Sequence, residues 1–244
     1  MLRGARAALA FLTRLPAGAL HADDFARAPA WFATVGLLIG ALQALVFAVA
    51  ALLWPLELAA LLAVAVGLLI TGGLHEDGLA DLFDGLGSGR PKERALEIMR
   101  DSQIGSFGAL ALGLAMAARI MALATLGPLA CVALIAGQAG SRGLMAILLR
   151  TGPYLRSSGA GTGMTGPFGA RGAALLGAAL VFGFGLLGWY AGWAVLGGIA
   201  GLLIGAGLIR IWAMNRLGGL TGDVFGAAQV LGDIGFLLGV LACL

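Results

Sequence analysis

Three aspartates, Asp77, Asp81 and Asp84, are the residues of this sequence best placed to do chemistry. Successive spacings of four and three residues put all three carboxylates on one face of a helix. Like charges so arranged repel one another, and the repulsion grows beside an apolar medium unless a cation neutralises it. Oxygen ligands clustered without cysteine suit Mg²⁺ or Mn²⁺. The pattern predicts a catalytic metal site held by these three residues, with a solvated acidic turn as the alternative.

The acidic residues of the chain are concentrated around this triplet. Seven of the twelve lie between residues 76 and 101, so we place the active-site segment at about residues 71–105. His75 precedes the triplet and is a candidate catalytic base, because histidine titrates near neutral pH. The alternative is a histidine without a catalytic role that is hydrogen-bonded at the surface of the membrane, whose spans are derived below.

A second charged element begins at Pro91. Proline suits the first turn of a helix, and Leu96, Met99 and Arg100 share a face at helical spacing. We expect a short helix on the membrane surface whose charges are mostly solvated. Asp101 differs because it stands where the next apolar run begins, and we assign substrate binding to Arg100 and Asp101.

Membrane-spanning helices must position these residues. The 244 residues are 60% hydrophobic and 11% charged, whereas soluble domains carry about 25% charged residues. A transmembrane helix needs roughly 20 apolar residues. The fold class is therefore an all-α, polytopic integral membrane helix bundle in a lipid bilayer, a single domain over residues 1–244 with short interfacial helices. The apolar runs predict seven spans, at about residues 32–54, 58–74, 105–127, 128–149, 172–190, 193–209 and 226–244.

The basic residues predict the orientation of these spans. With the N-terminus inside, all 13 Lys and Arg outside the spans fall on one face, the cytoplasmic one by the positive-inside rule. Arg3 and Arg6 precede an apolar stretch too short for a signal peptide, so an interfacial amphipathic helix is expected there. The net charge of +3 comes from these few arginines and indicates no nucleic-acid-binding face.

Two arginines fall inside predicted spans, where a charge is expensive. Arg142 would lie about 10 Å from the cytoplasmic end at 1.5 Å per residue. Its guanidinium could there bind a phosphate in a bidentate fork, or pair with a structural partner such as Asp233. Arg119 lies deeper, and we expect a structural role for it.

Glycines and polar loops complete the pattern. Gly197, Gly201 and Gly205 repeat at four-residue spacing, which predicts close packing of helices. Residues 161–166 match G-x-G-x-x-G formally, but no strand precedes them, so a flexible loop is expected. Thr221 and Asp223 stand just before the seventh span and are candidates for substrate binding, with a turn that starts the helix as the alternative.

Together these segments resemble the cobalamin synthase family, the adenosylcobinamide-GDP ribazoletransferases of the late cobamide pathway. The matching blocks run in order along nearly the whole chain. They are Phe11-Leu12-Thr13-Arg14-Leu15-Pro16, residues 71–84, Leu96-Glu97-Ile98-Met99-Arg100-Asp101-Ser102 with Ile104-Gly105, Ser141-Arg142-Gly143, and residues 217–223 with Gly226-Ala227.

The resemblance implies a reaction and its partners. The hydroxyl of α-ribazole, or of its 5′-phosphate, attacks the cobinamide-bearing phosphorus of adenosylcobinamide-GDP, GMP leaves, and Mg²⁺ is required. A metal and carboxylates fit such a transfer, because phosphate oxygens must be neutralised. The resemblance also implies the bacterial cytoplasmic (inner) membrane. Glu76 departs from the family pattern, which has an apolar residue there. The choice of acceptor, and whether the chain is a monomer or a homo-oligomer, stay open.

Two other functions compete with this interpretation. A CDP-alcohol phosphotransferase also joins an alcohol to a diphosphate at membrane aspartates, and Asp77-Gly78-Leu79-Ala80 echoes its D-G-x-x-A opening. That family continues with arginine, where Asp81 stands here. A transporter would place polar residues along a pathway through the membrane, whereas these gather at one face.

Overall fold

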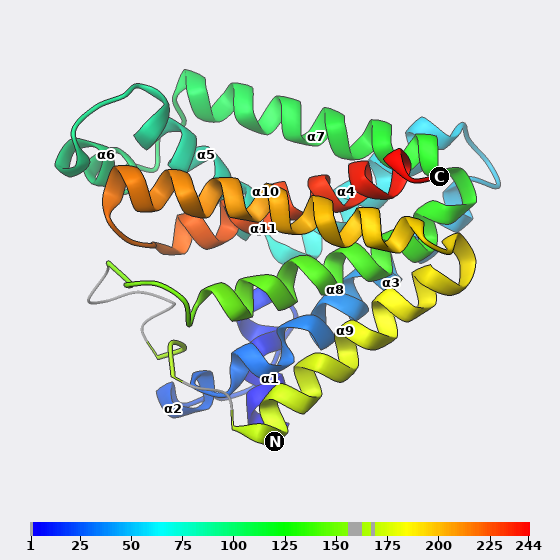
Figure 1. The fold of residues 1–244 in the computed structure, drawn as a ribbon, viewed down its shortest axis with the longest axis horizontal. Helices are drawn as coiled ribbons and strands as arrows, with labels where there is room; N and C mark the ends of the chain where they lie inside the picture. Colours follow the sequence, from blue (N-terminus) through cyan, green and yellow to red (C-terminus); the bar gives the residue numbers. More distant parts are fainter. Residues whose placement is uncertain (1, 156–162, 167–168) are drawn as a thin grey trace.

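The computed structural model describes residues 2–155, 163–166 and 169–244 (Figure 1). Within those residues the fold is a bundle of α-helices without any β-strand. Its helices are α1 (Leu2–Leu12), α2 (Ala22–Phe25), α3 (Phe32–Ala50), α4 (Leu56–Thr71), α5 (Leu74–Gly87), α6 (Lys92–Ile98), α7 (Ser106–Leu126), α8 (Ala130–Leu148), α9 (Ala170–Ala191), α10 (Ala194–Leu217) and α11 (Gly222–Ala242), with 3-10 turns η1 (Ala28–Trp31) and η2 (Gly127–Leu129).

The long helices account for the predicted spans. In the described part of the chain, five helical stretches are long and apolar enough to cross a membrane, or six if α4 and α5 together form one bent span. One of the five, residues 106–148, contains both α7 and α8. Each of these has about the length that a bilayer requires, and they run in opposite directions (Figure 1). Counting α7 and α8 separately gives six spans, or seven with α4 and α5 as one bent span, the number expected from the sequence.

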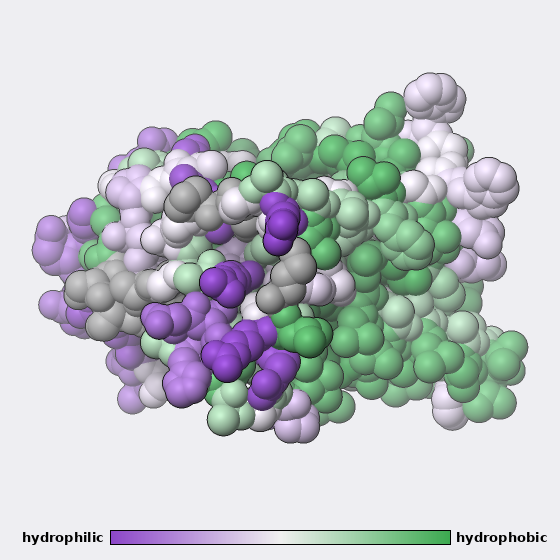
Figure 2. Space-filling view, turned by 90° about the horizontal axis from the view of Figure 1, so that it is seen from below, coloured by the Kyte–Doolittle hydropathy of each residue, from purple (hydrophilic) through white to green (hydrophobic). Residues whose placement is uncertain are grey.

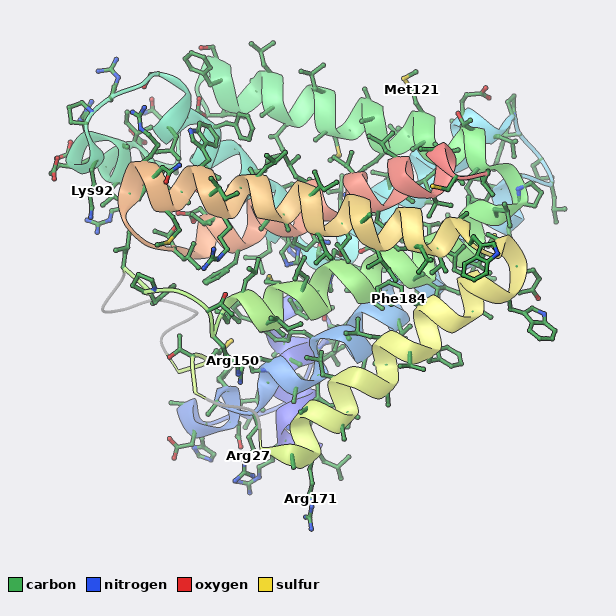
Figure 3. All side chains as sticks on the ribbon, viewed as in Figure 1. Arg27, Lys92, Met121, Arg150, Arg171 and Phe184 are labelled. Atoms are coloured by element: carbon green, nitrogen blue, oxygen red, sulfur yellow. The ribbon has the colours of Figure 1, made fainter. Side chains whose placement is uncertain are left out.

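Polar and apolar residues separate along the long axis of the molecule. Hydrophilic residues gather toward the left of Figure 2, and hydrophobic residues cover the right. Lys92 and Arg150 lie toward the polar end in Figure 3, whereas Met121 and Phe184 lie toward the apolar end. The connections α3–α4, α7–α8 and α9–α10, at the right of Figure 1, contain no Lys or Arg. The one-sided distribution of basic residues is therefore a property of the fold.

Glycines let the helices approach closely, as their spacing predicts. An ideal Cβ at Gly201 of α10 would lie 1.9 Å from the backbone oxygen of Gly235 on α11. The corresponding distance is 2.3 Å from Gly197 to the oxygen of Gly239. No larger residue fits between these backbones, so close packing in this pair depends on glycine.

A sharp bend separates α4 from α5 and creates the helix that carries the aspartates. The two helices meet at 90° across Gly72 and Gly73, both at φ +70°. L-residues with a side chain rarely adopt this left-handed conformation, so the glycine pair permits the bend. The expected second span thus ends at Thr71, and the aspartates lie on a separate helix.

Candidate active site

Helix α5 presents the three predicted aspartates at its surface. Asp77 is exposed, and Asp81 and Asp84 are half-buried. Leu79 and Leu82 are fully buried on the opposite side, so α5 is amphipathic and docks on the bundle through leucines. The helix predicted from the spacing of the aspartates is confirmed, and at 1.5 Å per residue the row extends over about 10 Å.

Asp84 is tied to the start of α7. Its two carboxylate oxygens accept hydrogen bonds from the backbone N–H groups of Gly105, at 2.7 Å, and Gly108, at 2.8 Å. The N-terminus of a helix has unpaired N–H groups and attracts negative charge. Asp84 therefore acts as the cap of α7, a role that the sequence did not predict.

This use of Asp84 bears on the expected Mg²⁺ site. Among the described residues, no three His, Cys, Asp or Glu side chains lie close enough together to hold a metal ion by themselves. Mg²⁺ usually takes one or two protein carboxylates and completes its shell with substrate phosphates and water. Asp77 and Asp81, one turn apart on α5, fit that donor set. Each oxygen of Asp84 keeps a second lone pair, and its contact with a metal stays a prediction.

Helix α11 crosses α5 closely and brings Asp223 to the carboxylate row. An ideal Cβ at Gly78 would lie 2.9 Å from the Cα of Asp223, so only glycine permits this contact. Thr221 is fully buried. Its hydroxyl oxygen accepts from the N–H of Val224 at 3.4 Å, and the hydroxyl donates to Asp223 at 3.2 Å. Thr221 thus caps α11, as the alternative of a helix-starting turn predicts, and holds Asp223 in place.

A cavity of about 610 Å³ opens beside Asp77, at the bend between α4 and α5. Its lining combines an aromatic ring, a cation, two carboxylates and left-handed backbone. The residues that contribute these groups are Phe11, Arg14, Gly72, Gly73, Glu76 and Asp77.

A smaller cavity of about 250 Å³ lies at the other end of the carboxylate row. Asp84, Arg90 and Asp101 line it, so the structure brings the predicted residue Asp101 to the row. Arg100 follows α6, is exposed, and does not line either cavity.

Inside the bundle, Arg119 joins two buried carboxylates. Its guanidinium nitrogens lie 2.9 Å from Glu76 on α5 and 2.9 Å from Asp233 on α11. All three side chains are at most 12% exposed. The expected structural role of Arg119 fits this geometry, and Glu76, the departure from the family pattern, supplies a second carboxylate. Asp233, considered as a partner for Arg142, pairs directly with Arg119.

Arg142 belongs to the same buried network. It donates a hydrogen bond to Gln138, whose amide nitrogen donates to Asp233 at 3.0 Å. With Glu76, Asp233 and Arg119, it forms a set of two cations and two anions. Arg142 is 2% exposed and lines neither cavity, so its binding of a phosphate stays a prediction that no cavity contact supports.

His75 also lies inside the bundle, behind the carboxylate row. It is 2% exposed, and neither ring nitrogen has a hydrogen-bond partner among the residues described. It does not line the cavity beside Asp77. Its predicted role as a catalytic base therefore stays a prediction that no cavity contact supports.

Sequence reasoning missed several residues of this site. The sequence pattern assigns no separate role to Arg14, which lines the cavity in the structure. A lone glutamine in a span carries no charge, so Gln138 does not stand out; its four-residue spacing from Arg142 is the signal that could identify it. Of the glycine-rich stretch 161–166, residues 161 and 162 lie outside the described residues.

The fold and the site together define a class: a helical, membrane-type protein that gathers carboxylates at its polar end. Comparison with known proteins supplies the family. The family model described as cobalamin-5-phosphate synthase matches residues 4–241. The chain therefore belongs to the cobalamin-5-phosphate synthase family, as the resemblance of its sequence blocks predicts.

Individual relatives agree with this assignment. The adenosylcobinamide-GDP ribazoletransferases of Shigella dysenteriae and of Escherichia coli K12 are each 40% identical to the chain, over 96% of it and 98% of their own length. The enzyme of the same name from Shewanella frigidimarina is 38% identical, over 96% of the chain and 92% of its own length. No solved structure matches the chain significantly. The family membership decides against a CDP-alcohol phosphotransferase and a transporter.

Proposed function

We propose that this protein joins α-ribazole, or its 5′-phosphate, to adenosylcobinamide-GDP with release of GMP. A hydroxyl oxygen of the acceptor forms a new bond to the cobinamide-bearing phosphorus. The bond from that phosphorus to the oxygen bridging the diphosphate breaks, GMP takes the electron pair, and the proton of the attacking hydroxyl is released to solvent. Relatives of nearly equal length that carry the corresponding name support this proposal. The observation that carries it in the structure is the row of carboxylates beside a cavity of about 610 Å³.

Mg²⁺ is the proposed cofactor, held by Asp77 and Asp81 together with the diphosphate of the substrate. When bound, the ion would neutralise phosphate oxygens and so favour departure of GMP. Asp77 is exposed and lines the cavity, so its carboxylate can meet a substrate without rearrangement. Asp84 positions α7, and through it the loop that carries Asp101, beside the row.

The protein would work in the cytoplasmic (inner) membrane of a bacterium with this site facing the cytoplasm. The polar end of the bundle carries the basic residues, and the opposite connections lack Lys and Arg. Positive loops stay on the cytoplasmic side. Soluble nucleotide substrates would then reach the carboxylates directly.

The decisive experiment measures GMP released from adenosylcobinamide-GDP by the purified protein in lipid nanodiscs, with α-ribazole or its 5′-phosphate as acceptor. Release should require an acceptor, stop with EDTA and return with excess Mg²⁺. Asp77→Asn should lower the rate by about 10²–10³, the usual cost of losing one electrostatic contact to a transition state. Turnover indifferent to EDTA would remove the metal from the proposal.

Glu93 provides a matched control for this experiment. It is an exposed carboxylate on α6 and lines neither cavity. Glu93→Gln removes the same charge from the same end of the molecule, so turnover should stay near that of the unaltered protein. If Asp77→Asn and Glu93→Gln behave alike, the carboxylate row is not the catalytic site.

A further inference from the structure

The cavity at the bend between α4 and α5 is lined by both positively and negatively charged side chains. Arg14 contributes the cation, and Glu76 and Asp77 contribute carboxylates. Glu76 forms an ion pair with Arg119 at 2.9 Å. Among the described residues, the charged side chains of the lining that have no ion pair are therefore one cation, Arg14, and one anion, Asp77.

Arg14 is held at this place by the backbone. Its N–H donates to the carbonyl oxygen of Ile70 in the last turn of α4, at 2.7 Å. Its guanidinium lies over Gly72, where an ideal Cβ would come within 2.2 Å of Nε. Among the described residues no carboxylate forms an ion pair with Arg14. The fold thus brings an arginine without a protein counter-ion to the cavity, where a phosphate can bind in its fork.

The start of α5 adds to this preference for an anion. Gly72, Gly73 and Leu74 line the cavity, and no side chain caps the N-terminus of this 14-residue helix. A helix N-terminus favours phosphate through its free N–H groups and its dipole. It supplements the arginine, which is the principal contact.

The rest of the lining suits a nucleoside. Asp77 can accept hydrogen bonds from ribose hydroxyls, as carboxylates do in dinucleotide sites. The ring of Phe11, held by stacking on Phe32 with centroids 5.7 Å apart, offers an apolar surface for a base. A volume of about 610 Å³ falls within the range of roughly 300–1,000 Å³ that takes drug-sized ligands. A nucleoside phosphate is a ligand of that size.

We propose that this cavity binds the nucleoside acceptor and that Arg14 binds its 5′-phosphate, so that Arg14 selects the phosphorylated acceptor. This inference rests on the proposed function. It places the ribose hydroxyls beside Asp77, at one end of the carboxylate row, where the diphosphate of the other substrate is expected.

The test compares the two acceptors in GMP release, using Arg14→Gln and, as a matched control, Arg171→Gln. Arg171 is also exposed and points away from the bundle in Figure 3. In Arg14→Gln the KM for α-ribazole 5′-phosphate should rise roughly 10- to 100-fold, as expected for a lost charge-assisted contact. The KM for α-ribazole should stay unchanged, and Arg171→Gln should change neither.

Equal effects on both acceptors, or no effect on either, would overturn the role of Arg14. Absence of GMP release by the unaltered protein with both acceptors would instead refute the proposed function. If Arg14→Gln fails to give a monodisperse protein, ribose 5-phosphate and ribose are compared as inhibitors of the unaltered protein. Ribose 5-phosphate should compete with the phosphorylated acceptor, and inhibition no stronger than that by ribose would count against the proposal.

A lipid headgroup offers the same phosphate chemistry, and nanodiscs of two compositions separate the two sources. If Arg14 binds the acceptor, its effect on KM should be the same in phosphatidylcholine with and without phosphatidylglycerol. If the KM for both acceptors depends on phosphatidylglycerol, and this dependence disappears in Arg14→Gln, Arg14 contacts a lipid and the proposal is overturned.

Discussion

Replacing Asp84 by asparagine separates a structural aspartate from a catalytic one. Asp84 accepts backbone N–H groups from Gly105 and Gly108 with its two oxygens. Asparagine keeps one oxygen acceptor, which can serve the N–H of buried Gly108, and turns its amide donor toward the N–H of Gly105. Gly105 is exposed, so water can replace that bond, but both N–H groups lose their charged acceptor.

The expected cost follows from these two positions. Losing a hydrogen bond to a charged group costs about 1.5–3 kcal/mol, which includes the favourable placement of a negative charge at a helix N-terminus. This cost would lower the Tm by about 3–12 °C in a chain of this size. The assay is thermal unfolding in detergent, followed by the fluorescence of the tryptophans.

Asp77→Asn is the matched comparison, because Asp77 is exposed on the same helix face. Its free energy of unfolding should change by no more than about 0.5 kcal/mol, so its Tm should stay nearly the same while its turnover falls. The reasoning is refuted if Asp84→Asn unfolds at the same temperature as the unaltered protein. It is refuted equally if high Mg²⁺ restores the turnover of both variants alike, since Asp84 would then be a metal ligand of the same kind as Asp77.

Three further predictions concern the bundle. Arg119→Met should destabilise the protein by about 3–5 kcal/mol, because two buried carboxylates lose their cation; a Tm unchanged in detergent would contradict the ion pairs. Gly201→Ala should lower the free energy of unfolding by about 1–3 kcal/mol, because the added methyl group forces α10 away from α11. Gly207→Ala, with open space around its Cβ position, should be neutral or stabilising. Equal Tm values for the two variants would contradict the close packing. In a background without native cysteines, Glu57→Cys should react with an impermeant thiol reagent in intact cells and Ser88→Cys should not; labelling at position 88 would reverse the orientation.

The helical class and the row of aspartates were predictable from the sequence. Apolar runs of about 20 residues have few alternatives to a membrane helix, because a bilayer leaves no water for unpaired backbone groups. The spacing of Asp77, Asp81 and Asp84 is a local property of one helix, and α5 confirms it. The four-residue spacing of Gly197, Gly201 and Gly205 likewise predicts the close helix packing that the structure shows.

The tertiary structure decided which of these residues are used inside the fold and which face a ligand. Asp84 and Asp77 have the same local pattern, yet only Asp84 meets the start of α7, which lies more than 20 residues away. Arg119 joins carboxylates from α5 and α11, and Arg14 reaches the cavity because the glycine bend turns α5 away from α4. Helical periodicity depends on neighbours three or four residues apart, so it is readable from the chain. Ion pairs and cavities depend on the packing of distant helices, whose relative placement no local spacing specifies.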